Sequence, residues 1–208
     1  MFKWRLVWEH FKQMNHYIAF GSILFFAGMV IGGTNPAFKA FLDAQLSGIA
    51  ELVSKIDESS NPTLSMIKLI FLNNAIKSIV VIYLGAFLGI LPFFFLVVNG
   101  MVIGYLLKAS AELHGGAYVF ELIVKGLLPH GILEIPAIII ACAYGLRFGV
   151  LVLKAVGASL FGRSKEGSAG TDIKEFVIRT VPVVIILTIT LLIAAIIEST
   201  FTMWLVTM

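Results

Sequence analysis

A histidine and a carboxylate lie four residues apart in one of the most apolar regions of the chain. His130 and Glu134 belong to the stretch 128–137, which continues in mainly apolar residues to Gly149. If this stretch is a helix that begins at Pro129, the four-residue spacing places both side chains on one face. Pro129 suits the first turn, where its missing N–H is not needed. Such an ionisable pair could bind a substrate, a proton or an ion.

Composition places this pair inside a membrane. Of 208 residues, 59% are hydrophobic and 13% are charged, and the mean hydropathy is +0.99. A soluble domain carries about 25% charged residues. The apolar runs are long and unbroken, unlike the alternating ~10-residue segments of outer-membrane barrels. We therefore expect an all-α integral membrane bundle with lipid as its solvent.

The same composition argues against several function classes. The net charge is only +3 and the basic residues are scattered, so we expect no nucleic-acid partner. The single cysteine, Cys142, cannot form an intrachain disulfide. One His and one Glu are too few for a closed zinc site, and no Ser, His and Asp residues form a plausible hydrolytic set. We expect no enzyme activity, no metal and no cofactor.

Hydropathy and length predict about five transmembrane helices, because each crossing needs about 20 residues. The N-terminal segment 1–16 mixes basic and aromatic residues, which is typical of an amphipathic helix at the membrane interface. We expect the first span to remain in the mature protein, since no small-residue cleavage site follows it. The expected spans are 17–34, 68–88, 93–110, 127–153 and 177–197, with an external segment at 35–67 containing an amphipathic helix and a cytoplasmic linker at 154–176.

Length also brings polar residues into the membrane. The charge-free run 78–107 is too long for one span and too short for two, which predicts a hairpin near residues 89–92 and a second span that begins near Lys68. That span must contain Asn73, Asn74 and Lys77. The fourth span has a charge-free centre at 135–146, so Glu134 also enters the bilayer.

These positions predict an intramembrane polar cluster. The second and fourth spans run in the same direction, and at ~1.5 Å per residue Glu134 lies about 8 Å into its span, in the outer half. A lone charge near the bilayer centre costs roughly 2.5 to 3.5 kcal/mol, so we expect Lys77 to pair with Glu134. The cluster would be either a solute, proton or ion site or an internal contact between spans, and its members are Asn73, Asn74, Lys77, Asn99, His130 and Glu134.

Glycines recur at a spacing of four in four different spans. Such pairs allow helix backbones to approach closely in lipid, which predicts a tightly packed bundle. We expect most of this packing within one chain, with packing between copies in a homo-oligomer as the alternative. The glycines are Gly28, Gly32, Gly85, Gly89, Gly100, Gly104, Gly145 and Gly149.

The distribution of Lys and Arg predicts the orientation in the cell membrane. With five spans, nine basic residues fall on the side of the N-terminus and six on the other side. Because cytoplasmic loops carry the excess of Lys and Arg, we expect a cytoplasmic N-terminus and an external C-terminus.

Several motifs together resemble those of the stage II sporulation protein M (SpoIIM) family. They are Phe71-Leu72-Asn73-Asn74, Pro92, Asn99-Gly100 with Gly104, the stretch 128–137, and Gly145-Leu146-Arg147-Phe148-Gly149. The Pro-His-Gly-x-x-Glu-x-Pro pattern of 129–136 is similar to a broad, standalone branch of the family that also occurs where no spores are made.

The resemblance implies a multispan helical membrane protein. It also implies a scaffold or localiser, since the name-giving member organises a complex with two peptidoglycan-degrading partners during engulfment. The leading hypothesis is therefore a membrane scaffold, with the lipid bilayer, other membrane or envelope proteins and peptidoglycan hydrolases as candidate partners. The rival hypothesis is a small transporter or channel that uses the Lys/Glu/His/Asn cluster.

Overall fold

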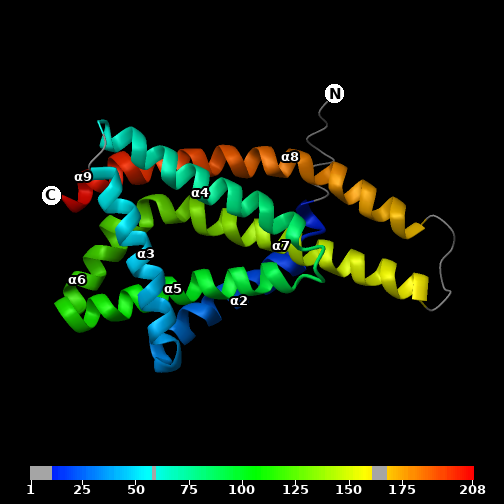
Figure 1. Cartoon of the computed structure of the whole chain (residues 1–208), viewed down its shortest axis with the longest axis horizontal. Coiled ribbons are helices and arrows are strands. Elements are labelled where there is room, and N and C mark those ends of the chain that lie inside the picture. The colour runs from blue at the N-terminus through cyan, green and yellow to red at the C-terminus, as the bar shows by residue number, and fades with distance from the viewer. Residues whose placement is uncertain (1–10, 58–59, 161–167) are drawn as a thin grey trace.

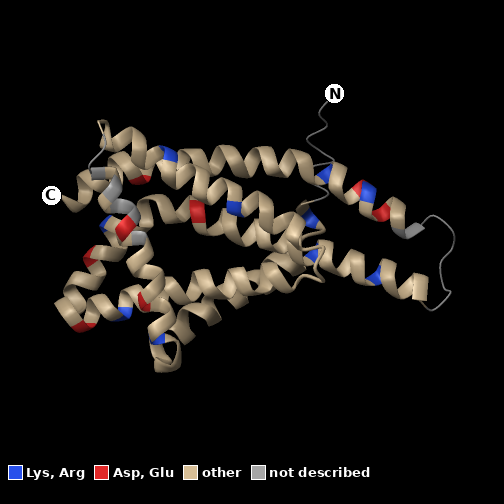
Figure 2. Cartoon of the chain, in the orientation of Figure 1, with Lys and Arg blue, Asp and Glu red and all other residues tan. Residues whose placement is uncertain are grey.

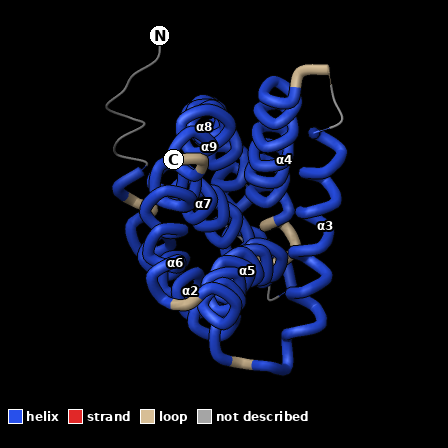
Figure 3. The backbone as a smooth tube through the Cα atoms, turned by 90° about the vertical axis from the view of Figure 1, so that its left-hand side faces the viewer, coloured by secondary structure: helices blue, strands red, loops and turns tan. Residues whose placement is uncertain are grey.

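The computed structural model describes residues 11–57, 60–160 and 168–208, and within those ranges the chain is helical with no strand (Figure 3). Five helical spans are long and apolar enough to cross a membrane. This confirms the predicted all-α membrane bundle. The spans are Asn15–Thr34, Pro62–Leu84, Ile90–His114, Gly116–Leu160 and Gly170–Val206.

The long helices run along one axis of the molecule, and one shorter helix crosses them (Figure 1). The long helices are α2 (Asn15–Thr34), α4 (Pro62–Leu84), α5 (Ile90–His114), α7 (Leu128–Leu160) and α8 (Ser168–Ile197), and the crossing helix is α3 (Lys39–Asp57). Charged residues gather toward the two ends of the bundle, with few between them (Figure 2). The 23 residues of α4 span ~35 Å, which matches the ~30 Å hydrocarbon core of a bilayer.

Helix α7 is the central element. In the span that contains it, 61% of the most apolar window is buried, against 22% to 33% in the other four spans. It packs against α2, α4, α5 and α8, and Figure 3 shows it at the middle of the bundle. Its buried residues include many small ones, among them Ala137, Ala141, Cys142 and Ala143. Small side chains let four helices approach one axis.

The α4–α5 hairpin lies a few residues earlier than predicted. Helix α4 begins at Pro62, six residues before the expected start at 68, and ends at Leu84, so the turn occupies 85–89. The side chain of Asn61 accepts a hydrogen bond from the Leu64 N–H at 3.1 Å and caps the helix. Pro92 falls in the first turn of α5, where its missing N–H is not needed.

Segments outside the expected spans are largely helical. The stretch 111–126, between the third and fourth expected spans, contains the end of α5, then α6 (Gly116–Glu121) and the π-helical η2 (Leu122–Leu127), which continues into α7. The residues after the fifth expected span form the π-helical η3 (Glu198–Thr202) and α9 (Met203–Val206) in continuation of α8. Helix satisfies the backbone hydrogen-bonding groups that an apolar environment would leave unpaired.

The structure describes only parts of two other expected segments. The linker expected at 154–176 is helical at both ends, since α7 continues to Leu160 and α8 begins at Ser168. Most of the interfacial helix expected at 1–16 lies outside the described residues, and within its described part Met14 is fully buried.

The eight predicted glycines meet in two places. Gly28 and Gly32 of α2 face the backbone of α5, and Gly100 and Gly104 of α5 face the backbone of α2. Gly85 and Gly89 likewise meet α7 at Gly145 and Gly149, and we call this set the α4–α7 glycine contact. A Cβ added to Gly85 would overlap the Gly145 carbonyl oxygen, and a Cβ on Gly149 would overlap the Gly89 backbone nitrogen. All eight glycines thus pack within one chain.

Candidate functional site

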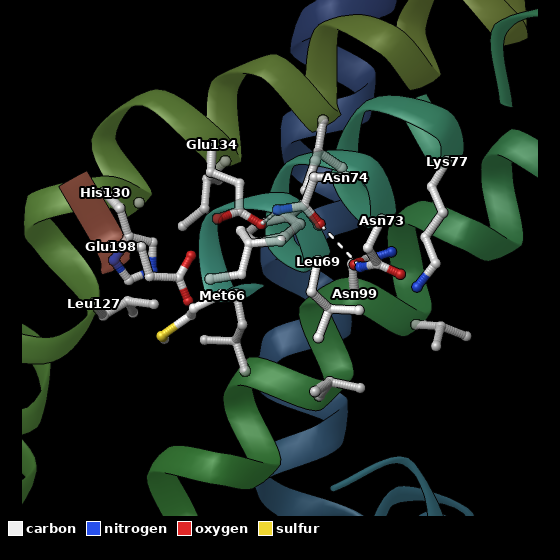
Figure 4. Close-up of a pocket in the computed structure, with 18 of the residues that line it drawn as sticks. Met66, Leu69, Asn73, Asn74, Lys77, Asn99, Leu127, His130, Glu134 and Glu198 are labelled. Atoms are coloured by element: carbon white, nitrogen blue, oxygen red, sulfur yellow. Dashed lines mark hydrogen bonds between the residues drawn. The ribbon is translucent and has the colours of Figure 1, made fainter. Parts of the chain in front are cut away.

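A cavity of about 360 Å³ lies between α4, α5 and α7, and it contains all six residues of the predicted polar cluster. Ile56 of α3 and Glu198 of η3 also line it. Figure 4 shows the polar side chains projecting into this space from the three long helices. We call it the polar pocket. The polar residues that line it are Asn73, Asn74, Lys77, Asn99, His130, Glu134 and Glu198.

A hydrogen-bonded chain of side chains links α4 to α7 across the pocket. The Asn74 Nδ2 donates to Glu134 Oε1 at 2.8 Å, and the Asn73 Nδ2 donates to Asn74 Oδ1 at 3.1 Å. Because Asn74 uses both ends of its amide, its side chain is held in one orientation. Glu134 is therefore positioned by a neutral donor and keeps Oε2 for another partner.

The expected ion pair between Lys77 and Glu134 is absent, since no salt bridge joins these two described residues. Lys77 is exposed at the rim of the polar pocket, and it also lines a second, apolar hollow of about 420 Å³ between α4 and α5. The position of α4 along α7 explains the difference. Asn74 precedes Gly85 by eleven residues, and Glu134 precedes Gly145 by eleven, so the α4–α7 glycine contact places Asn74 level with Glu134.

Asn99 has a smaller part in the pocket than expected. Its Nδ2 donates to the Phe95 carbonyl oxygen of its own helix at 2.7 Å. The amide is thus partly satisfied within α5. Asn99 lines the pocket without an observed hydrogen bond to the other described members of the cluster.

Glu198 is the member that sequence reasoning missed. It directly follows the fifth apolar run, where a charge is typical of a helix end, yet the helical path continues through η3 and α9. This continuation turns Glu198 into the pocket beside His130 (Figure 4). Ligand atoms of His130, Glu134 and Glu198 all lie within 4.8 Å of one another. The apolar residues at 203–206, which follow Glu198 in the sequence, are the signal that the helix continues.

The polar pocket lies beside the middle of α4. Asn74 is the thirteenth of the 23 residues of α4. The rim residues Asn73 and Lys77 are exposed, whereas Asn74, His130, Glu134 and Glu198 are half-buried. The polar pocket therefore runs from an open rim on α4 to a half-buried floor on α7 and η3.

The arrangement suits a positively charged occupant. Two carboxylates and an imidazole face one cavity, and no Lys or Arg of the described residues forms a salt bridge with either carboxylate. Ionisable groups at membrane depth often mark pathways for protons, ions or substrates. A proton or a cation at this point would neutralise the carboxylates.

Comparison with known proteins relates almost the whole chain to one family. The family model described as Stage II sporulation protein M matches residues 18–203. An uncharacterized protein of Methanocaldococcus jannaschii is 30% identical over 127 residues, which cover 61% of this chain and 52% of the relative. This chain therefore spans about half the length of that relative. No solved structure matches.

Proposed function

Because the chain belongs to the Stage II sporulation protein M family, we propose that it is a membrane protein of that family that binds a small cationic solute in the polar pocket. In this proposal it acts as a small transporter or channel. The observation that carries the proposal is a cavity of about 360 Å³ that reaches His130, Glu134 and Glu198 at mid-bundle depth.

The ionisable groups around the polar pocket favour binding of a solute over a purely structural contact between α4 and α7. A structural contact between α4 and α7 needs only the hydrogen bond from Asn74, which a glutamine at 134 could also accept. Glu198 and His130 add two more ionisable groups at the same place, although each such group inside a membrane is expensive. A bound cation would offset that expense.

Flux measurements in liposomes test this function. Entrapped pyranine would report proton flux, and an entrapped fluorescent chelator would report entry of divalent cations. We expect wild-type protein to give flux above empty liposomes and Glu134→Gln to abolish it. Glu112→Gln, an exposed glutamate outside the pocket, is the matched control and should keep the wild-type flux. Equal flux in wild type, Glu134→Gln and empty liposomes would contradict the proposal.

Family membership favours a second function, a scaffold or localiser for membrane or envelope proteins. Peptidoglycan hydrolases are the candidate partners. Crosslinking in native membranes followed by purification of the tagged chain tests this role, with recovery of a hydrolase as the expected result. Glu134→Gln should leave recovery unchanged if the scaffold role is independent of the polar pocket. Failure to retrieve any envelope protein would count against the scaffold.

The proposed orientation remains an N-terminus in the cytoplasm and a C-terminus outside. Helix α7 has 33 residues and α8 has 30, so at ~1.5 Å per residue both exceed a ~30 Å hydrocarbon core. The end of α7 and the start of α8 extend past the α4–α5 turn (Figure 1). The basic residues Lys154, Lys174 and Arg179 lie in these extensions, which supports a cytoplasmic location for them.

A further inference from the structure

We propose that the polar pocket binds a divalent first-row transition-metal cation, held by His130, Glu134 and Glu198. This inference rests on the proposed function and names the class of solute for the same pocket. Ligand atoms of these three side chains lie within 4.8 Å of one another and face one cavity. The sequence alone offered one His and one Glu, and η3 supplies the third ligand.

The spacing of the ligand atoms suits one bound ion. Three atoms no more than 4.8 Å apart lie within about 2.8 Å of a common centre, so inward shifts of about 0.7 Å reach the ~2.1 Å of zinc–nitrogen and zinc–oxygen bonds. Side-chain torsions of two glutamates and one histidine can supply such shifts without moving the helices.

The charges of the ligands also match a divalent ion. Two ionised carboxylates and a neutral imidazole carry a charge of −2, so a divalent cation makes the complex neutral. Neutrality matters here because an uncompensated charge is costly in an apolar interior. None of the described lysines or arginines forms a salt bridge with Glu134 or Glu198 that would supply this compensation.

Neighbouring side chains orient two of the ligands, as is usual around metal sites. Asn74 donates to Glu134 Oε1 and leaves Oε2 for the ion. The Thr202 hydroxyl lies 3.4 Å from His130 Nδ1. This contact suits the tautomer with a proton on Nδ1 and a free lone pair on Nε2. Thr202 and Glu198 both belong to η3, so this short segment provides one ligand and orients another.

The chemistry of the donors selects the class of cation. Imidazole suits zinc, iron, nickel and copper, and carboxylates also suit manganese, whereas magnesium and calcium prefer oxygen ligands alone. A site with three protein ligands leaves at least one coordination position for water. An incompletely enclosed ion in an open pocket can exchange, which fits a solute better than a permanently bound structural ion.

Binding to purified protein tests the site. The chain would be purified with a tag that contains no histidine, stripped with a chelator and titrated with Zn²⁺ or Mn²⁺ by calorimetry. We expect one ion per chain, and we expect Mg²⁺ in large excess not to compete. His130→Ala and Glu198→Gln should each weaken binding about tenfold or more. Binding should also release protons and weaken as the pH falls, because the ligands must be deprotonated.

Matched controls lie outside the pocket. His114→Ala removes an exposed histidine that packs on Tyr118, and Glu112→Gln removes an exposed glutamate, so both variants should bind the ion as the wild type does. Glu198→Asp keeps the carboxylate but shortens it by one methylene, and it should bind more weakly than wild type even if other variants fail to fold. Wild-type protein that binds no Zn²⁺ or Mn²⁺, or binding unchanged in His130→Ala, would overturn the proposal.

The failure of this inference and the failure of the proposed function are distinguishable. Flux that depends on Glu134, without any binding of Zn²⁺ or Mn²⁺, would overturn the metal site and leave the transport function standing. Binding that depends on His130 and Glu198, without flux in liposomes, would support the site and overturn transport.

Discussion

Helices α4 and α7 meet in two places that have opposite characters. At the α4–α7 glycine contact the two backbones touch, because neither helix carries a side chain there. Eleven residues earlier on both helices, Asn74 bonds Glu134 and a cavity opens beside them. Eleven residues are about three helical turns, so both places lie on the same face of each helix.

The contrast shows how one helix pair can combine a close backbone contact with a cavity. Glycine sets the separation and level of the two helices, because a Cβ on Gly85, Gly145 or Gly149 would overlap atoms of the opposite side of the contact. Three turns away, near the middle of α4, longer side chains then bridge a gap that they cannot fill. The glycine contact is therefore what positions the polar pocket, although none of its residues is polar.

The largest expected effect comes from breaking the glycine contact. Gly85→Ala would place a methyl group against the Gly145 carbonyl oxygen, and overpacking of this kind costs about 1 to 3 kcal/mol of the free energy of unfolding. Unfolding in detergent micelles would measure it. Gly157→Ala on α7 is the matched control, since its Cβ meets no atom within 4 Å. The control should gain up to about 1 kcal/mol from helix propensity, and a similar gain in Gly85→Ala would refute the contact.

A smaller effect on the free energy of unfolding is expected where Asn74 bonds Glu134 in the same helix pair. A double-mutant cycle with Asn74→Ala and Glu134→Ala should give a coupling of about 0.6 to 2 kcal/mol, the range for hydrogen bonds between membrane helices. The same cycle with Asn73→Ala should give less, because Asn73 reaches Glu134 only through Asn74. Zero coupling between Asn74 and Glu134 would show that the bond does not form.

The smallest effect is expected for Lys77. Lys77→Met and Glu134→Gln should change the free energy of unfolding additively, within about 0.5 kcal/mol, because no ion pair joins the two residues. A coupling well above that value would restore the ion pair expected from the sequence and place Lys77 inside the pocket instead of at its rim.

The sequence was sufficient to predict the class of fold, because long apolar helices follow from hydropathy and length. The start of α4 and its position along α7 were harder to predict. Asn61 and Pro62 fall inside the external segment expected at 35–67, but they begin α4. The α4–α7 glycine contact, and not the start of the helix, sets Asn74 level with Glu134.

Glu198 shows a different limit of sequence reasoning. A charge after a long apolar run has the same appearance whether the helix ends or continues, and only packing decides between them. Here η3 continues α8 and packs against α4 and α7, which brings Glu198 to His130. Proximity between residues 68 positions apart is a property of tertiary structure that no local pattern encodes.

The polar pocket should be open to water, and thiol labelling tests this most directly. The single native cysteine, Cys142, is fully buried and should not react with a water-soluble cationic methanethiosulfonate. In a Cys142→Ala background, Asn99→Cys places a thiol on the wall of the pocket. We expect rapid labelling of Asn99→Cys in the membrane and no labelling of Cys142. An unreactive Asn99→Cys in folded protein would contradict it.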